Sequence, residues 1–204
     1  MIEPRIDQEG MKLMKLFCKP WLLLFSLACS TLLPLSTIAQ QGPQPLLSPR
    51  DSTEVAMSGK RIKIDYGRPS MRGRKIMGEL VPYNRWWRTG ANEATSFVTE
   101  ADLEMGGVSI PRGSYTLYTL PSETQWKLIV NKQTGQWGTI YKAELDLARL
   151  NLQKRLLRRP VEKLTITLKK NDNGAGVLRI EWERTSLWIP FAAKKESAPN
   201  SQSR

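Results

Sequence analysis

Residues 61–66 have the sequence Arg-Ile-Lys-Ile-Asp-Tyr, in which charged and apolar side chains alternate strictly. Successive side chains of a β-strand point to opposite faces, so Ile62, Ile64 and Tyr66 share one face and the three charged side chains share the other. This pattern is typical of a half-buried strand. It predicts a sheet with one face against a core and one face in water.

The same period of two returns three times further along the chain. It occurs in residues 126–131 (Trp-Lys-Leu-Ile-Val-Asn), 164–169 (Leu-Thr-Ile-Thr-Leu-Lys) and 178–183 (Leu-Arg-Ile-Glu-Trp-Glu). Each segment places its apolar side chains at alternate positions. We therefore expect antiparallel strands with one wet face in all three.

Turn-forming residues separate these runs at the spacing that hairpins require. They are Ser58-Gly59, Gly106-Gly107, Pro111-Arg112-Gly113, Pro121-Ser122 and Asn171-Asp172-Asn173-Gly174. Residues 141–159 fit either helical or strand spacing, and we expect a short helix near 142–146 followed by a strand. The fold class predicted is all-β: a single antiparallel β-sandwich or barrel-like domain with one short helix.

The first 39 residues have the features of a cleaved signal peptide. Lys12, Lys15 and Lys19 precede the apolar run 21–27, and Thr37-Ile38-Ala39 stands before Gln40 as a cleavage site. Residues 1–10 are acidic and polar, which favours Met11 as an alternative start. Pro34 and polar residues interrupt the apolar segment, so we expect no transmembrane span after cleavage.

Cys29 allows a second interpretation, in which a lipid anchors the exported protein through this cysteine. Residues 30–38 stay apolar where a lipoprotein turns polar, and this favours simple cleavage. The predicted localisation is therefore the periplasm or the medium. The predicted organisation is a flexible leader (40–49), one β-rich domain (50–192) and a disordered tail (193–204).

Composition excludes several reaction classes. The chain has no histidine, and both cysteines, Cys18 and Cys29, lie in the expected leader. Histidine triads, cysteine nucleophiles and His/Cys zinc sites are thus excluded from the exported domain. The turn 171–174 lacks the ligand spacing and closing Glu of a calcium loop, so we expect no metal and no cofactor.

The chain is basic, with a net charge of +12. Loss of residues 1–39 removes four basic and three acidic side chains and leaves +11. Such a charge attracts anionic partners. Export and the lack of aromatic residues inside the basic cluster 154–159 argue against nucleic acid.

Four segments together resemble the bacterial domain-of-unknown-function family 2911 (DUF2911). They are 65–74 (DYGRPSMRGR), 87–95 (WRTGANEAT), 113–121 (GSYTLYTLP) and 129–138 (IVNKQTGQWG), and the resemblance runs from about residue 48 to about 191. It implies an exported, β-rich bacterial domain and lends no reaction. Trp86 departs from the family pattern by making a double tryptophan.

Three polar loops contain the candidate ligand-binding residues. The first loop, 67–78, carries guanidinium groups among glycines, which suits bidentate contact with carboxylate or phosphate. The second, 87–95, sets polar groups beside two tryptophans, a combination that binds sugars. The third, 131–138, follows a strand. The candidates are Arg68, Arg72, Arg74, Arg88, Asn92, Glu93, Asn131, Lys132 and Trp137.

Each loop also has a structural interpretation. The arginines of the first loop can pair with Asp65, Glu79 and Glu93 to pin it onto the sheet, and adjacent tryptophans commonly cover a core edge. Residues 133–135 are equally an ordinary turn. A shared site requires that the three loops converge.

The leading functional hypothesis is an exported, non-catalytic binding module for an anionic small molecule or a sugar-like (glycan) ligand. A carboxylate-dependent glycan hydrolase using Asp65 and Glu93 is the first alternative. A structural envelope protein is the second. The sequence leaves the oligomeric state open.

Overall fold

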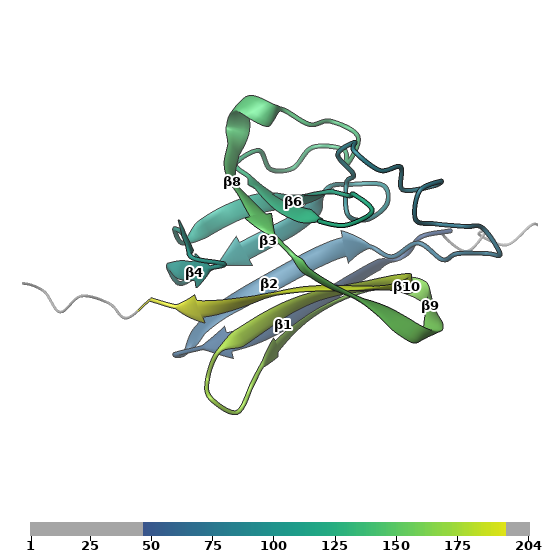
Figure 1. Ribbon diagram of the computed structural model, residues 1–204. Coiled ribbons are helices and arrows are strands. Elements are labelled where there is room, and N and C mark those ends of the chain that lie inside the picture. The colour runs from purple at the N-terminus through teal and green to yellow at the C-terminus, as the bar shows by residue number, and fades with distance from the viewer. Residues whose placement is uncertain (1–46, 195–204) are drawn as a thin grey trace, which may run out of the picture. The chain divides into compact units, whose positions relative to one another are not determined.

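The computed structural model describes residues 47–194, which form two antiparallel β-sheets (Figure 1). The expected signal peptide, its cleavage site, Cys29 and residues 195–204 lie outside the described residues. No helix within residues 47–194 has both the length and the apolar character needed to cross a membrane.

The first sheet has six strands in the order β1-β2-β3-β6-β7-β8, and the second has four in the order β5-β4-β10-β9. The strands are β1 (Arg50–Met57), β2 (Lys60–Gly67), β3 (Thr95–Thr99), β4 (Leu103–Met105), β5 (Val108–Ile110), β6 (Gly113–Leu120), β7 (Lys127–Asn131), β8 (Asp146–Asn151), β9 (Gln153–Lys170) and β10 (Gly176–Ala193). All neighbouring strands are antiparallel, so the predicted all-β sandwich is confirmed.

Four of the five predicted turns join paired strands, and the short helix is confirmed. The fifth turn, Pro111-Arg112-Gly113, leads instead from β5 of the four-stranded sheet to β6 of the six-stranded sheet. Ser58-Gly59 joins β1 to β2 with positive φ at both residues, and Gly106-Gly107 joins β4 to β5 in the same way. This backbone conformation matches the twist of the flanking strands. The short helix is a 3₁₀ turn, η2 (Ala143–Leu145), and β8 follows it directly.

The core lies between the two sheets. Ile62, Ile64 and Tyr66 of β2 are buried on its first side, and Leu178 and Ile180 of β10 are buried on its second. Each of these side chains occupies the apolar phase of the alternation found in the sequence. The period of two thus decided which faces are removed from water.

The expectation of a wet outer face is wrong for β7. Ile129 and Asn131, which occupy its outer phase, are 1 % and 0 % exposed. The segment after β7 folds back over this face, where Asn131 Nδ2 donates to the carbonyl of Lys142 at 2.8 Å. The outer face is therefore a second, smaller buried region.

The backbone at Glu183 interrupts β10 and reverses which of its residues face the core. Even-numbered residues up to Trp182 are buried, and from Leu187 onward odd-numbered residues are buried. The pairing with β9 shifts on both sides of Glu183, whose left-handed φ of +52° breaks the alternation of the strand. At the two shifts β10 advances by two residues each time, while β9 advances from Thr165 to Val161 and then to Leu156, so the additional, bulged residues lie in β9. At this position the Glu183 carboxylate reaches the first loop, where it accepts from the amide of Met77 at 3.0 Å.

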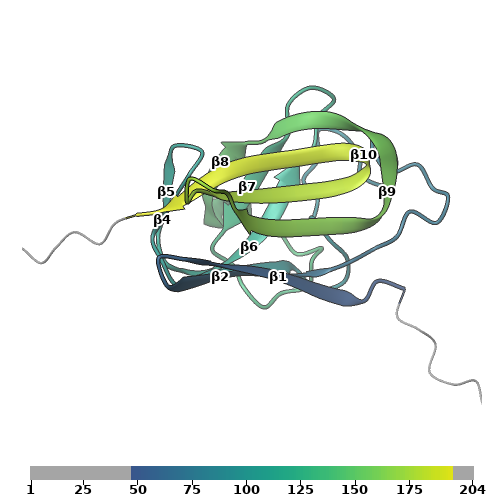
Figure 2. The same cartoon turned by 90° about the horizontal axis from the view of Figure 1, so that it is seen from below.

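The free edge of β9 is closed by side chains and loop carbonyls rather than by another strand. Figure 2 shows β9 curving from beside β8 to lie near β1. Its alternate amides donate to three different acceptors: Leu164 N to the carbonyl of Pro69, Ile166 N to the hydroxyl of Tyr66, and Leu168 N to Oγ1 of Thr53. Buried amides need such partners. The edge is thereby protected from pairing with another chain.

Tyr66→Phe tests this closure. The variant keeps the buried ring and leaves the amide of Ile166 without its acceptor, so we expect a loss of about 1–3 kcal/mol in unfolding free energy. Amide hydrogen exchange at Ile166 should accelerate. Tyr83→Phe removes a half-buried phenol hydroxyl elsewhere and is the control. Unchanged stability and exchange in Tyr66→Phe would contradict the assigned role.

Candidate functional site

The three polar loops converge at one end of the sandwich around a cleft of about 470 Å³, here called the loop cleft. Pro69 and Arg74 come from the first loop, and Gly138 comes from the third. The second loop contributes Trp87, Arg88, Gly90, Ala91 and Asn92. The remaining lining residues are Leu47, Ser48, Leu80, Trp86, Thr139 and Trp182. The three loops therefore meet at this cleft, and the third contributes Gly138 but none of its candidate side chains.

Backbone hydrogen bonds fix the second loop to the third. Ala94 N donates to the carbonyl of Gln136 at 3.1 Å, and Gly138 N donates to the carbonyl of Asn92 at 2.9 Å. A Cβ on Gly138 would lie 2.8 Å from Cδ of Arg88. Glycine at 138 thus lets the third loop close over the stem of Arg88.

A second close approach fixes the first loop to the second. A Cβ on Gly67 would overlap the carbonyl oxygen of Ala91, so no other residue fits there without moving the backbone. The two loops meet at this point. Their relative position is set by backbone contact rather than by flexible side chains.

The floor of the loop cleft is aromatic. The ring of Trp87 stacks on that of Trp182, with centroids 5.8 Å apart and planes 17° apart. Trp182 is buried and its Nε1 donates to the carbonyl of Glu162 at 3.2 Å. The position of Trp87 is therefore set by the core of the second sheet.

Two arginines line the loop cleft and are held by carbonyl oxygens. Arg74 donates from Nε to the carbonyl of Met71 at 2.9 Å and from Nη2 to that of Ser70 at 2.8 Å. Arg88 donates from Nε to the carbonyl of Gly90 at 3.2 Å. These bonds orient each guanidinium group without neutralising its charge.

The other two arginines among the candidates lie outside the lining of the loop cleft. Arg68 donates to the carbonyl of Leu164 at 3.0 Å and to Oγ1 of Thr165 at 3.1 Å, so it ties the first loop to β9. It also forms an ion pair with Asp51 at 3.3 Å. Arg72 donates to the carbonyl of Leu47 at 2.9 Å.

The candidates of the third loop also lie outside this lining. Asn131 is fully buried and its amide bridges Asp146 and Lys142. Lys132 is exposed, and the ring of Trp137 is 48 % exposed. Of the nine candidate ligand-binding residues, the structure places Arg74, Arg88 and Asn92 in the cleft.

The two carboxylates proposed for hydrolysis, Asp65 and Glu93, share one guanidinium group. Arg50 donates from Nε to Asp65 at 2.7 Å and forms a second ion pair with Glu93 at 3.4 Å. The arginine that pairs with these two carboxylates is thus Arg50 of β1, and not an arginine of the first loop as the structural interpretation expected. Among residues 47–194, no cluster of three His, Cys, Asp or Glu side chains is placed to hold a metal ion.

Sequence reasoning missed several lining residues. Leu47 and Ser48 belong to the expected leader, yet the carbonyl of Ser48 accepts from Asn92 Nδ2 at 3.3 Å. Trp182 occurs in the regular alternation of β10, where nothing marks one buried residue as part of a cleft. Only the double tryptophan at 86–87 gave a local signal.

A second group of aromatic rings covers the outer face of the six-stranded sheet. Trp86 packs edge-on against Tyr118, with ring centroids 5.6 Å apart. It also packs in a tilted arrangement against Tyr141, with ring centroids 4.9 Å apart. The Tyr141 hydroxyl donates to Oδ2 of Asp146 at 2.7 Å, and Arg149 donates to the same oxygen at 2.7 Å. Burial, reinforced by Asp146, raises the pKa of Tyr141 to about 12.

This shift predicts that stability falls at alkaline pH. Below about pH 10 the phenol is protonated in both the folded and the unfolded state, so its contribution is fully present. Between about pH 10 and 12 only the unfolded state ionises readily, and the contribution is lost. Melting temperatures measured from pH 8 to 12 should fall less steeply in Tyr141→Phe than in the wild type. Equal slopes would contradict the assignment.

Comparison with known proteins identifies the family. The model of the family described as "Protein of unknown function (DUF2911)" matches residues 48–191, a range that includes all ten strands except the last two residues of β10. Neither the curated proteins nor the solved structures that were compared include a match to this chain. The matched range covers well over half of the sequence and contains all three loops of the site, and on this evidence the chain belongs to the DUF2911 family.

Proposed function

We propose that the protein is an exported, non-catalytic binding module whose loop cleft takes an anionic, sugar-like ligand. The observation that carries the proposal is the chemistry of the cleft lining. Aromatic rings (Trp86, Trp87) lie beside two arginines (Arg74, Arg88), and no carboxylate is among the lining residues.

The size and composition of the cleft suit a small ligand. Its volume of about 470 Å³ lies within the range of ligand pockets, roughly 300–1,000 Å³. Aromatic faces pack against the C–H groups of a sugar ring. Guanidinium groups make bidentate hydrogen bonds with carboxylate or phosphate. An acidic or phosphorylated sugar uses both features at once.

The cleft is organised before any ligand arrives. Its loops are joined through Gly67 and Gly138, and its two arginines are oriented by carbonyl oxygens. Little side-chain or loop entropy is then lost on binding, which raises affinity.

Arg50 argues against the alternative of a carboxylate-dependent glycan hydrolase. Its guanidinium group bonds both Asp65 and Glu93, and so occupies the space in which a glycosidic oxygen would have to lie between an acid and a base. A binding role requires no such pair. A purely structural role would leave the loop cleft without a ligand, and binding measurements separate these cases.

Binding to galacturonic acid, glucose 6-phosphate and neutral glucose tests the proposal. The two anionic sugars should raise the melting temperature, because a ligand at about 100 times its Kd stabilises the native state by roughly 2.7 kcal/mol. Neutral glucose should bind more weakly. Arg74→Ala should weaken anionic binding about tenfold, the cost of one charge-assisted contact.

Arg158→Ala is the matched control, since it removes one exposed arginine from β9, away from the cleft lining. It should leave affinity unchanged. Absence of any thermal shift across the panel would favour a structural role. If Arg74→Ala and Arg158→Ala lose affinity equally, binding of the anionic sugars depends only on the net charge of the protein.

A further inference from the structure

A second cleft shares Trp86 with the loop cleft. It has a volume of about 280 Å³ and is here called the outer cleft. Its lining residues are Asn84, Arg85, Trp86, Leu120, Ile129, Tyr141 and Arg149. Trp86 belongs to the lining of both clefts, so the two hollows share one aromatic side chain as their common wall.

Trp86 is held in place although it is partly exposed. Trp86 is 38 % accessible to solvent, and its ring packs against Tyr118 and Tyr141, whose own ring centroids are 4.9 Å apart. Tyr118 is itself fixed, since its hydroxyl donates to the carbonyl of Ile140 at 2.6 Å and accepts from Gln136 Nε2 at 2.9 Å. The shared wall is thus a fixed aromatic surface.

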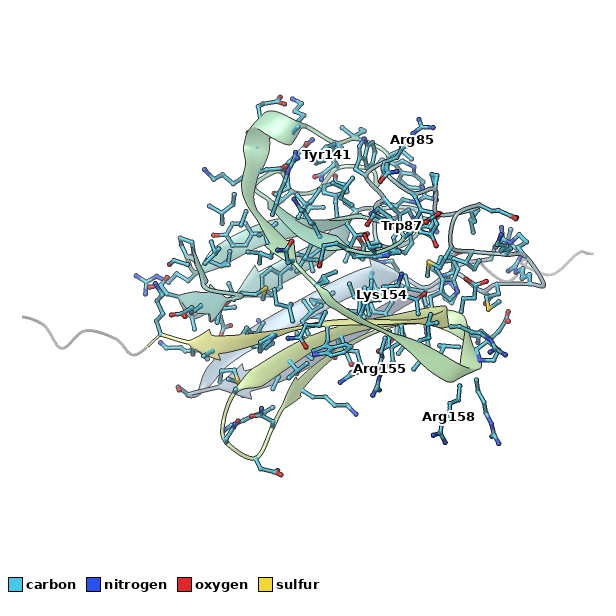
Figure 3. All side chains as sticks on the ribbon, viewed as in Figure 1. Arg85, Trp87, Tyr141, Lys154, Arg155 and Arg158 are labelled. Atoms are coloured by element: carbon cyan, nitrogen blue, oxygen red, sulfur yellow. The ribbon has the colours of Figure 1, made fainter. Side chains whose placement is uncertain are left out.

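The charge of the two clefts has a single sign. The loop cleft contributes Arg74 and Arg88, the outer cleft contributes Arg85 and Arg149, and neither lining contains a carboxylate. Figure 3 shows Arg85, Trp87 and Tyr141 in one region of the molecule, with Arg158 well away from them. Two basic hollows that share one aromatic side chain suit a ligand with repeated negative charge.

Asp146 contacts two lining residues of the outer cleft, Tyr141 and Arg149, and its carboxylate already has hydrogen-bond partners. Its side chain is 10 % exposed, and it accepts hydrogen bonds from Tyr141, Arg149 and Asn131. It offsets part of the charge on Arg149. Arg85 is exposed and extends from the segment before Trp86, so its charge is available to a ligand.

We propose that the ligand is a linear anionic glycan that crosses Trp86 and places successive sugar units in the loop cleft and the outer cleft. This inference rests on the proposed function of the loop cleft and adds the length and polymeric nature of the ligand. Sugar rings pack on the tryptophan, and carboxylate or sulfate groups meet the arginines on either side. An acidic peptide lacks the flat C–H faces that an aromatic wall recognises.

The test compares galacturonic acid with tetragalacturonate by calorimetry on the purified protein. The tetramer has four rings, and any one of them can bind in a single cleft. For this statistical reason alone, its apparent affinity exceeds that of the monomer about fourfold. If one tetramer occupies both clefts, its apparent affinity should rise by about tenfold or more beyond the statistical factor. Arg85→Ala should weaken tetramer binding about tenfold and leave monomer binding unchanged, whereas Arg74→Ala should weaken both.

The outcomes separate this inference from the proposed function. If the tetramer gains only the statistical factor and Arg85→Ala has no effect, the extended ligand is refuted while the loop cleft stands as a binding site. If neither sugar binds, both proposals fail. Arg158→Ala controls for net charge, and equal weakening in this variant would also refute the extended site.

Two further probes define the class of ligand. A chondroitin sulfate tetrasaccharide, which carries sulfate groups in addition to carboxylates, tests whether the clefts also accept a sulfated glycan, and Arg85 dependence with either glycan supports the proposal. A tetraglutamate peptide with an acetylated N-terminus and an amidated C-terminus carries the same number of carboxylates without sugar rings. If it binds as tightly as tetragalacturonate, the assignment to a glycan is overturned.

Discussion

The free edge of β9 is the constraint on which the rest of the structure depends. A strand at a sheet edge exposes a row of amides that must find acceptors. Here Thr53, Tyr66 and Pro69 supply them from the other sheet and from the first loop. The two sheets are thereby joined along one side by hydrogen bonds as well as by the core, and the first loop acquires a fixed position on the second sheet.

That fixed position sets the geometry of the loop cleft. Because Pro69 is bonded to β9, Arg68 and Met71 follow it onto the same strand, and Arg74 is left at the margin of the cleft. Glu183 of β10 also supports the loop, by accepting a hydrogen bond from the amide of Met77. The glycine-rich first loop therefore serves mainly as a cover for the β9 edge, and the cleft forms where this cover meets the second loop.

Much of the fold could be predicted from the sequence, because strand alternation and turn residues are local signals. Ile62, Ile64 and Tyr66 are buried as their period requires, and the paired glycines 106–107 form a hairpin. The burial of Ile129 on the outer face could not be predicted, since it depends on a segment that returns from residues 139–145. Nor does any local pattern separate Arg74, which lines the cleft, from Arg72, which does not. That difference arises from tertiary contacts.

The selective pairing of acids explains how a chain with interleaved charges obtains a purely basic site. Asp65 and Glu93 are both paired with Arg50, and Glu79 is paired with Lys75, so the acidic side chains near the loops have cationic partners outside the cleft lining. Arg74 and Arg88 are oriented instead by neutral carbonyls. A guanidinium group held in this way keeps its full charge for an incoming anion. Because Arg50 takes up two carboxylates, the anion-attracting field of the cleft depends on a residue of β1 that does not line it.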